Sequence, residues 1–371
     1  MKVALVHDWL VNYGGAEDVV SAILEIYPEA DIYTLVYDKK KMKGRFEGHK
    51  IFTSRLQKIP FATKIYTKLL KFMPGAFEAF DLSGYDLVIC SSSSCAKGVI
   101  TSPLTAHVAY VHTPMRYAWD LFFDYQKRSG RLTRFFMDKW MPGIRLWDYV
   151  SSQRIDKIVS NSNYIARRVK KFWNRDAQTI YPPVNTDYFA PSDAGTREDF
   201  YVFFSRLVPY KRADIAIDAC AALGKKLVVI GGGSEAQKLK ELSKDKKNIT
   251  FTGRISDEKV KEYLQKCKAL IFCAEEDFGI IPVQAQACGT PVIAFGKGGA
   301  TETVVENKTG VFFAEQTSES CAAAIQDFEK LEAAGKFDAK KIAAHAKTFS
   351  RDRFIKEFKA ACEEALADVR K

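Results

Sequence analysis

Short, largely apolar runs recur along the whole chain and are separated by longer segments of mixed polarity. In the first half of the sequence these runs lie at 3–6, 32–36, 87–90, 108–111 and 157–160. Such runs without alternation are typical of parallel strands that are buried on both faces, and the segments between them are long enough for helices. The pattern predicts a doubly wound α/β sheet in this half of the chain.

A second series of such runs begins near residue 200. It lies at 200–204, 226–230, 249–251, 269–273, 291–294 and 310–313. Between the two series, residues 181–196 are rich in proline, glycine and small polar residues, which is typical of a linker between domains. The sequence therefore predicts two Rossmann-like α/β domains, over 1–190 and 191–349.

A final helix is expected over about 353–369, after the second series of strands. From the architecture alone, we expect the segment 350–371 to pack back on the first domain. The length of 371 residues suits two domains, and 47% hydrophobic residues supply enough apolar surface for two packed cores. A wholly disordered chain is excluded.

Eight cysteines lie mostly within apolar segments, and no two of them form a CxxC pair. We interpret them as reduced core residues, because their spacing supports neither a disulfide framework nor a metal site. The apolar run at the N-terminus is too short for a signal peptide, and no later segment is long enough to span a bilayer. We expect the protein to remain in the cytoplasm.

Almost all of the net charge of +11 comes from one segment. Between Lys39 and Lys71 the chain has eleven lysines and arginines and a single acid, Glu47. Residues 55–73 place apolar residues near one face of a predicted helix. Such a helix can lie on an anionic membrane, where each cation adds about 1 kcal/mol to the binding free energy. Alternatively, it can pack on the protein core with its lysines solvated at the rim. The lysines around that face are Lys58, Lys64, Lys68 and Lys71.

A nucleic-acid-binding protein would also explain the positive charge. The basic segment has few aromatic residues for stacking, however, and no recognised nucleic-acid motif occurs in the chain. We therefore expect no nucleic-acid partner.

Gly14 and Gly15 follow the first predicted strand and precede a helix. Free backbone N–H groups and the positive end of the helix dipole would face an anion there, and a diphosphate is the natural candidate. A glycine pair in a loop is more often a turn without a ligand. The dinucleotide fingerprint GxGxxG is absent here, and the glycines at 231–233 lack its spacing too.

Two strand ends of the second series carry candidate binding residues. Arg206 and Lys211 follow a strand at the carboxyl edge of the sheet, where they could clamp two phosphates or form a solvated basic loop. Gly253, Arg254 and Ile255 close another strand with a turn that exposes backbone groups and could hold a base. Taken alone, that turn is only a strand end.

Residues 275–292 form the sharpest pattern, EEDFGIIPVQAQACGTPV. A strand ends in a cluster of three carboxylates, and Gly279 and a proline in the first helical turn leave bare N–H groups near that cluster. Such a site can hold sugar hydroxyls and phosphate together.

This segment, with SRLxxxKR at 205–212, closely resembles the retaining GT-B glycosyltransferases of the glycogen-synthase-like family (family 4 type), whose hallmark is two glutamates separated by seven residues. Within that family the sequence is most similar to bacterial mannosyltransferases of O-antigen and exopolysaccharide assembly, which use GDP-mannose. The matching segments are HDWLVNYGGAE at 7–17, VHTPMRYAWD at 111–120, YPPVNTDYF at 181–189 and EEDFGIIPV at 275–283.

The resemblance implies roles for residues of both domains. Glu276 is the first hallmark glutamate, near the donor sugar, and Arg206 and Lys211 bind the diphosphate. Gly14 and Gly15 form the loop that closes over the diphosphate from the other domain.

Further donor contacts follow from the same resemblance. Phe278, Gly279 and Ile280 belong to the donor site, and His112 contacts the donor hexose near the reacting carbon. A lone histidine after a strand is more often structural, so this role of His112 comes from the resemblance.

One position departs from the family pattern. The second hallmark glutamate, which holds the ribose hydroxyls in the family, falls at Gln284, and a neutral amide accepts weaker hydrogen bonds than a carboxylate. With Gly253, Arg254 and Ile255, Gln284 makes up the expected nucleoside site.

The resemblance also implies the reaction and the partners. We expect hexose transfer with retention, from a nucleotide sugar to a polyprenyl-diphosphate-linked saccharide, at the inner face of the cytoplasmic membrane. No cofactor and no metal are expected, since no Asp-x-Asp pair occurs and the cations can neutralise the leaving diphosphate. A UDP-sugar donor, and a sugar-nucleotide epimerase of the same two-domain build, are the alternatives.

Overall fold

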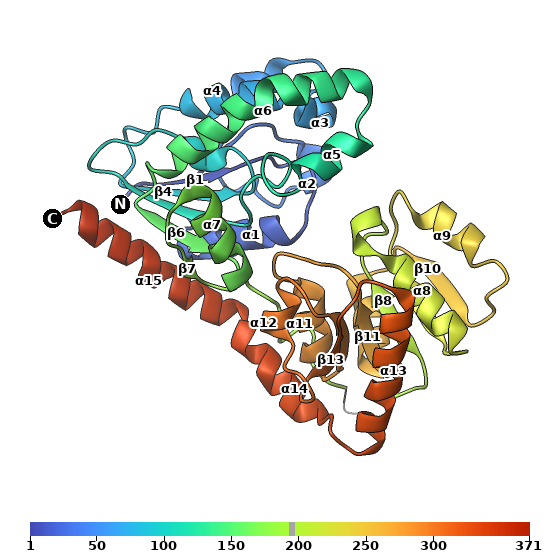
Figure 1. Cartoon of the computed structure of the whole chain (residues 1–371). Coiled ribbons are helices and arrows are strands. Elements are labelled where there is room, and N and C mark those ends of the chain that lie inside the picture. Colours follow the sequence, from blue (N-terminus) through green and yellow to red (C-terminus); the bar gives the residue numbers. More distant parts are fainter. Residues whose placement is uncertain (193–196) are drawn as a thin grey trace. The chain divides into compact units, whose positions relative to one another are not determined.

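The computed structural model describes residues 1–192 and 197–371, and it divides into two compact units (Figure 1). Unit 1 comprises Met1–Pro183 and Phe354–Lys371, and unit 2 comprises Val184–Arg353. Each of the eleven apolar runs in the sequence forms a strand, which confirms the α/β class. The last four residues of the expected linker, 193–196, lie outside the described residues. The division into folding domains at residue 190 stays a prediction.

Unit 1 is built on a parallel sheet of seven strands in the order β3-β2-β1-β4-β5-β6-β7. The strands are β1 (Val3–His7), β2 (Asp31–Thr34), β3 (Ile51–Thr53), β4 (Leu87–Ser92), β5 (Ala106–Val111), β6 (Lys157–Ser160) and β7 (Gln178–Thr179). β1, β4 and β5 are buried throughout, because helices cover both of their faces. The apolar pattern does not predict β3 and β7, which are short, partly exposed edge strands.

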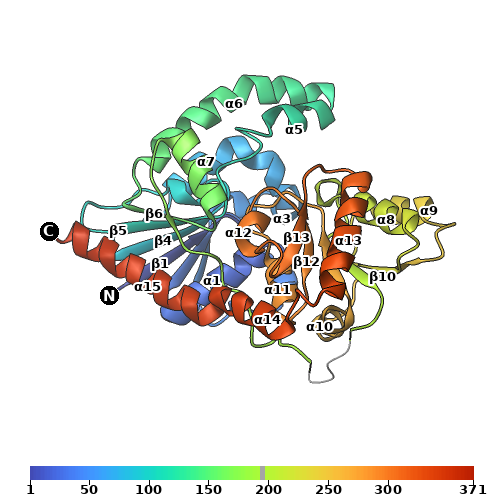
Figure 2. The same ribbon diagram turned by 60° about the horizontal axis from the view of Figure 1, so that its bottom comes forward.

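Helices cover both faces of the first sheet (Figure 2). One face packs on α3 (Ala62–Ile65), α4 (Met73–Glu78), α6 (Arg131–Ser152) and α7 (Asn163–Trp173). The other face packs on α1 (Gly15–Ile26), α2 (Lys39–Met42) and α15 (Arg351–Val369). Phe354 and Phe358 of α15 lie in this core, with ring centroids 5.6 and 5.8 Å from that of Tyr110. The short helix α5 (Phe122–Arg128) precedes α6, and the 3-10 helix η3 (Ala96–Gly98) follows β4.

Unit 2 contains a parallel sheet of six strands in the order β10-β9-β8-β11-β12-β13. The strands are β8 (Tyr201–Phe204), β9 (Leu227–Ile230), β10 (Ile249–Gly253), β11 (Ala269–Phe272), β12 (Val292–Phe295) and β13 (Gly310–Phe313). The other elements are η4 (Pro209–Lys211), α8 (Ala213–Ala222), α9 (Ala236–Leu242), α10 (Asp257–Lys266), α11 (Ile280–Ala287), α12 (Ala300–Thr303), α13 (Ser318–Ala333), α14 (Ala339–Ala346) and η5 (Lys347–Phe349). The core on one face of this sheet is formed with α8, α9 and α13.

The basic segment is not the continuous amphipathic helix expected over 55–73. It consists of η1 (Arg55–Lys58), α3, η2 (Tyr66–Phe72) and the start of α4. The break comes at Pro60, which lacks an N–H group and disfavours helical geometry in the residue before it, and Phe61 follows with a left-handed φ of 59°. A short 3-10 helix before Pro60 and a mixed α and 3-10 helical stretch from Ala62 to Glu78 therefore replace one regular helix.

All eight cysteines are buried and free, as expected for core residues. Burial raises the pKa of Cys288 and of Cys362 to about 12, so both thiols stay protonated at neutral pH. Across residues 1–192 and 197–371, no helix is long and apolar enough to cross a membrane.

Candidate functional site

The expected site residues lie in loops that follow strands. Because every strand in each sheet is parallel to its neighbours, these loops meet at the carboxyl edge of their sheet. Gly14 and Gly15 follow β1 in unit 1, and His112 follows β5 directly. In unit 2, Lys211 follows β8 and Glu276 follows β11. β8 and β11 are neighbours where the strand order of the second sheet reverses, which is where ligands bind in such folds.

Lys211 and Glu276 are in contact. The ammonium of Lys211 donates a hydrogen bond to a carboxylate oxygen of Glu276, and their side chains are 9% and 21% exposed. Lys211 ends η4, and a left-handed turn at Arg212 leads from it into α8. Arg212 donates to Asp214 through Nε and Nη2, so Lys211 is the cation of this loop that faces the carboxylate. The structure thus brings together two residues that the sequence singled out separately.

Arg206 lies on the same loop but takes a different position. Its side chain is exposed and donates to the hydroxyl of Tyr210 at 3.2 Å. It is therefore oriented along the surface of the loop, with a charge that an incoming anion can reach.

Close packing of glycines shapes this edge of the second sheet. A Cβ atom on Gly231 or Gly233 would overlap the carbonyl oxygens of Ser205 and Leu207, respectively. The glycines after β9 therefore let the loop that carries Arg206 lie directly against them. In the sequence, this glycine run shows only that the spacing of the dinucleotide fingerprint is missing.

A second glycine pair supports the carboxylate loop, and sequence reasoning missed it. Gly298 and Gly299 follow β12, and a Cβ on either would overlap the backbone of Glu276 or Phe278. The N–H group of Gly299 donates to the carbonyl of Glu276 at 2.8 Å. The motif Lys-Gly-Gly-Ala after a buried strand was the available signal.

The loop from Glu276 leads into α11 through Gly279, whose φ of 89° is in the left-handed region. Phe278 is buried, and Ile280 begins the helix, so the free N–H groups of its first turn lie beside the carboxylate loop. Gln284 lies one turn further along α11 and is partly exposed.

The expected nucleoside residues lie at the edge strand β10. Gly253 has a left-handed φ of 72°, and its carbonyl accepts from the N–H of Gly231 at 2.9 Å. The exposed Arg254 passes within van der Waals distance of Gly232, and Ile255 is partly buried beside it. β9 and β8 lie between β10 and β11, so this group is set apart from Glu276 along the sheet edge.

In unit 1, Gly14 is the exposed N-cap of α1 and has an extended conformation, with φ −167°. A Cβ there would meet only an ordinary contact with Glu17, so the conformation itself does not require glycine. Gly15 begins the helix, and its first turn contains Glu17 and Asp18.

His112 is hydrogen-bonded through Nε2 to the hydroxyl of Ser91 at 2.8 Å. Burial, reinforced by the neighbouring His7, lowers the pKa of His112 to about 3. The imidazole is therefore neutral at physiological pH, and each of its nitrogens has a separate role as donor or acceptor.

The end of β1 carries a further residue that the sequence analysis did not single out. The buried carboxylate of Asp8 accepts from the N–H groups of four consecutive residues after β4, at 2.6 to 2.9 Å. These residues are Ser93, Ser94, Cys95 and Ala96. Asp8 thereby fixes the loop that begins beside Ser91.

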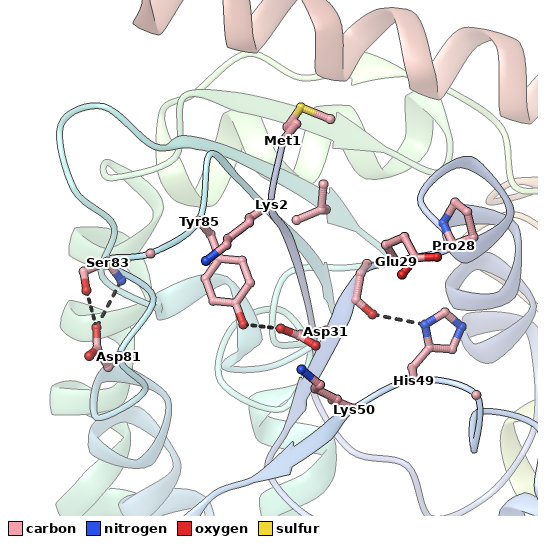
Figure 3. A pocket seen from close by; sticks show the side chains of 14 residues that line it. Met1, Lys2, Pro28, Glu29, Asp31, His49, Lys50, Asp81, Ser83 and Tyr85 are labelled. Carbon is pink, nitrogen blue, oxygen red and sulfur yellow. Dashed lines mark hydrogen bonds between the residues drawn. The ribbon is translucent and has the colours of Figure 1, made fainter.

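A groove of about 630 Å³ lies at the opposite edge of the first sheet, where β1, β2 and β3 begin (Figure 3). Its polar groups are bound to one another: Tyr85 donates to Asp31 at 2.6 Å, and the ring of His49 contacts the carbonyl of Ala30 at 3.1 Å. The groove lies at the opposite end of the strands of unit 1 from Gly14, Gly15 and His112.

Comparison with known proteins shows which sequences and structures the chain resembles. Residues 184–348 match the family model described as "Glycosyl transferases group 1". The chain is 27% identical over 237 residues to a D-inositol 3-phosphate glycosyltransferase of Mycobacteroides abscessus, covering 58% of this chain and 53% of that one. It is 31% identical over 184 residues to a GDP-mannose-dependent α-(1-6)-phosphatidylinositol monomannoside mannosyltransferase of Mycobacterium tuberculosis, covering 42% and 48%. The chain thus spans about half the length of these curated relatives.

Solved structures resemble the whole chain. The crystal structure of HepE of Anabaena in complex with UDP is 17% identical, with a TM-score of 0.73, over 98% of this chain and 100% of that one. Sucrose-phosphate synthase of Thermosynechococcus elongatus is 18% identical, with a TM-score of 0.74, over 99% and 100%. At this identity the likeness establishes the fold, and it confirms the expected GT-B architecture. Residues 184–348, which include Lys211 and Glu276, therefore resemble group 1 glycosyltransferases, and the whole chain has the GT-B fold.

Proposed function

We propose that the chain is a retaining glycosyltransferase that transfers a hexose from a nucleotide diphosphate sugar. The contact between Lys211 and Glu276 at the switch point of the second sheet carries this proposal. A cation and a carboxylate side by side suit a ligand that has a diphosphate next to a polyhydroxylated sugar, because the cation binds phosphate oxygens and the carboxylate accepts from hydroxyls.

In the proposed reaction, the bond between the anomeric carbon and the diphosphate breaks while an acceptor hydroxyl bonds to that carbon on the same face. The hydroxyl proton passes to the leaving diphosphate. Lys211, Arg206 and the N-terminus of α11 stabilise the charge that collects on the diphosphate, which is the role a metal plays in other enzymes. Glu276 accepts from sugar hydroxyls in unit 2, and the sugar contact proposed for the neutral His112 of unit 1 comes from the resemblance.

We propose GDP-mannose as the donor. The resemblance to bacterial mannosyltransferases supports it, as does the matching mannosyltransferase of Mycobacterium tuberculosis, whose name includes GDP-mannose. A UDP-sugar is the second candidate, because UDP is bound in the structure of HepE.

The test is to incubate the protein with GDP-mannose, UDP-glucose and UDP-N-acetylglucosamine, with and without EDTA. Release of one nucleoside diphosphate that persists in EDTA supports a metal-independent transferase. Conversion of the donor to an epimer without release of nucleotide would show an epimerase. Turnover that EDTA abolishes would contradict the metal-independent mechanism.

We further propose that unit 1 contacts an anionic membrane that holds a polyprenyl-diphosphate-linked saccharide acceptor, so that the protein is peripheral on the inner face of the cytoplasmic membrane. The four lysines of the basic segment, Lys58, Lys64, Lys68 and Lys71, are all exposed. Among them are large exposed apolar side chains, with Phe61 72% and Phe72 56% exposed. Cations beside exposed aromatic rings suit the interface of an anionic bilayer.

The same surface extends onto α6. The ammonium of Lys71 lies 4.7 Å from the ring centroid of Trp140, which stacks on Phe136 at 4.5 Å. Leu132 and Phe135 of α6 are 71% and 59% exposed. The proposed membrane surface therefore joins two segments that are far apart in the sequence.

Co-sedimentation with vesicles of phosphatidylglycerol tests this surface. We expect binding that weakens with salt, and a loss of binding in the double variant Phe61→Ser/Phe72→Ser. The matched control is Leu242→Ser, at a 63% exposed leucine of unit 2. Equal binding of all three proteins, or no binding at low salt, would contradict the proposal. Binding to a random DNA duplex instead of vesicles would favour a nucleic-acid partner.

A further inference from the structure

A continuous chain of hydrogen bonds and charges runs behind His112 in unit 1. Nε2 of His7 lies 3.5 Å from a carboxylate oxygen of Glu17, and Nδ1 of His7 lies 3.1 Å from the hydroxyl of Ser91. That hydroxyl lies 2.8 Å from Nε2 of His112. His7, Glu17 and Ser91 are 3%, 7% and 0% exposed, whereas His112 is partly exposed at the carboxyl edge of the sheet. This series of contacts leads from the buried carboxylate of Glu17 to His112, the one of these four residues that lies at the candidate site.

The strands and α1 place these residues together. His7 and Ser91 are the last paired residues of β1 and β4. His112 follows β5, which lies on the other side of β4. Glu17 is in the first turn of α1, directly after the glycine pair.

The carbonyl of Ser91 determines where the protons lie. It is 3.2 Å from Nδ1 of His7 and can only accept, so we assign a proton to Nδ1 of His7. The carboxylate of Glu17 near Nε2 can also only accept, so we assign a proton to Nε2 as well, and the ring is then a cation paired with Glu17. The hydroxyl of Ser91 then accepts from His7 and gives its own proton to Nε2 of His112. A neutral imidazole that accepts at Nε2 carries its proton on Nδ1.

We propose that Glu17, His7 and Ser91 are positioning residues that hold the ring of His112 and keep its proton on Nδ1. The inference rests on the proposed function, in which His112 contacts the donor hexose. Nδ1 of His112 has no protein partner among residues 1–192 and 197–371, so its N–H group is the donor that the site presents to a sugar hydroxyl. Without Ser91, the proton divides between the two nitrogens and a fraction of the enzyme presents an acceptor instead.

The test combines nitrogen NMR of the imidazoles with kinetics. The protein has five histidines, so His112→Gln identifies the His112 signals by their loss. In the free wild-type protein we expect the His112 shifts of a neutral ring protonated at Nδ1. Ser91→Ala is expected to give a mixture of tautomers and a roughly tenfold fall in kcat with little change in the KM for the donor, as for one lost hydrogen bond in the transition state.

Two further variants separate positioning from general damage. Ser91→Thr keeps the hydroxyl and is expected to restore the Nδ1 tautomer and most of kcat. Ser92→Ala removes the next hydroxyl of β4, which is also buried and accepts from the N–H of Lys97 at 3.4 Å, and is expected to change neither readout.

The outcomes distinguish the two proposals. A wild-type His112 protonated at Nε2, or a Ser91→Ala variant with the wild-type tautomer and kcat, overturns the positioning role alone. If no nucleotide sugar is turned over, the proposed function fails, and the tautomer measurement still decides whether Ser91 controls the proton of His112.

Discussion

The ammonium of Lys211 contacts the carboxylate of Glu276 between the ends of β8 and β11. Both side chains are largely withdrawn from water, so in the free protein each charge neutralises the other. A diphosphate that binds Lys211 must compete with this carboxylate. In the proposed function, the ion pair therefore sets how tightly the nucleotide binds as well as where the sugar lies.

Glu276→Gln should separate nucleotide binding from turnover. Without the carboxylate charge, we expect the Kd for GDP or UDP to fall about fivefold, since a paired cation is released for the diphosphate. We expect kcat to fall roughly 100-fold, because the sugar loses a partner in the transition state. Calorimetry and nucleotide-release assays measure the two effects.

The control for Glu276 is Glu329→Gln, in an ion pair of the same unit. Glu329 of α13 binds Lys225 at 2.7 Å, and Lys225 precedes β9, away from the carboxyl edge. This variant should leave Kd and kcat unchanged. Equal effects of both variants would mean that Glu276 acts on stability and not on the ligand.

Gln284→Glu should tighten nucleotide binding. Gln284 is partly exposed on α11 where the resemblance places a carboxylate for the ribose hydroxyls, and a carboxylate accepts stronger hydrogen bonds than an amide. We expect the Kd for the preferred nucleoside diphosphate to fall about tenfold by calorimetry. Gln237→Glu adds the same charge on the exposed side of α9 and should have no effect. Equal or weaker binding by Gln284→Glu would refute the proposed ribose contact.

The low pKa of His112 predicts a pH dependence of stability. Its folded pKa of about 3 lies below the ordinary value of about 6.5, so between these values the unfolded chain binds a proton that the folded protein excludes. Stability must therefore decrease as the pH falls through this window. Burial also lowers the pKa of His107, to about 4, and adds to the effect.

Urea unfolding of the wild type and of His112→Gln at pH 7 down to pH 4 checks this sign. We expect the midpoint of the variant to change less with pH than that of the wild type, with a residual slope from His107. Parallel curves for the two proteins would show that His112 ionises normally in the folded state.

The sequence was sufficient to predict the buried strands, but it did not predict which side chains of different strands are in contact. Uniform apolar runs identified β1, β4 and β5, because strands covered on both faces need no polar side chains. The pairing of His7 with Ser91 depends on the register of β1 against β4, which the pattern of one strand does not contain.

Two other differences between the expected and the observed structure have local causes. Pro60 interrupts the basic segment in spite of its helical periodicity, because side-chain spacing does not report a missing backbone donor. Gly298 supports Glu276 through close backbone packing, which a glycine pair in the sequence does not distinguish from an ordinary turn.

The buried ion pair of unit 1 should be a major determinant of its stability. Lys97 is 1% exposed and binds Asp148 at 2.9 Å, and the second oxygen of Asp148 accepts from the indole N–H groups of Trp119 and Trp173 at 2.8 and 2.7 Å. Lys97→Met removes the cation and leaves a buried carboxylate without its countercharge. We expect the free energy of unfolding to fall by about 3 to 5 kcal/mol.

Lys157→Met is the matched control, because Lys157 pairs with the exposed Glu364 at 2.6 Å in the same unit. Water already solvates much of that pair, so the loss should be below about 1 kcal/mol. Urea denaturation followed by tryptophan fluorescence measures both variants, since two of the indoles surround Asp148. A loss for Lys97→Met no larger than that for Lys157→Met would show that the two indole donors alone satisfy Asp148.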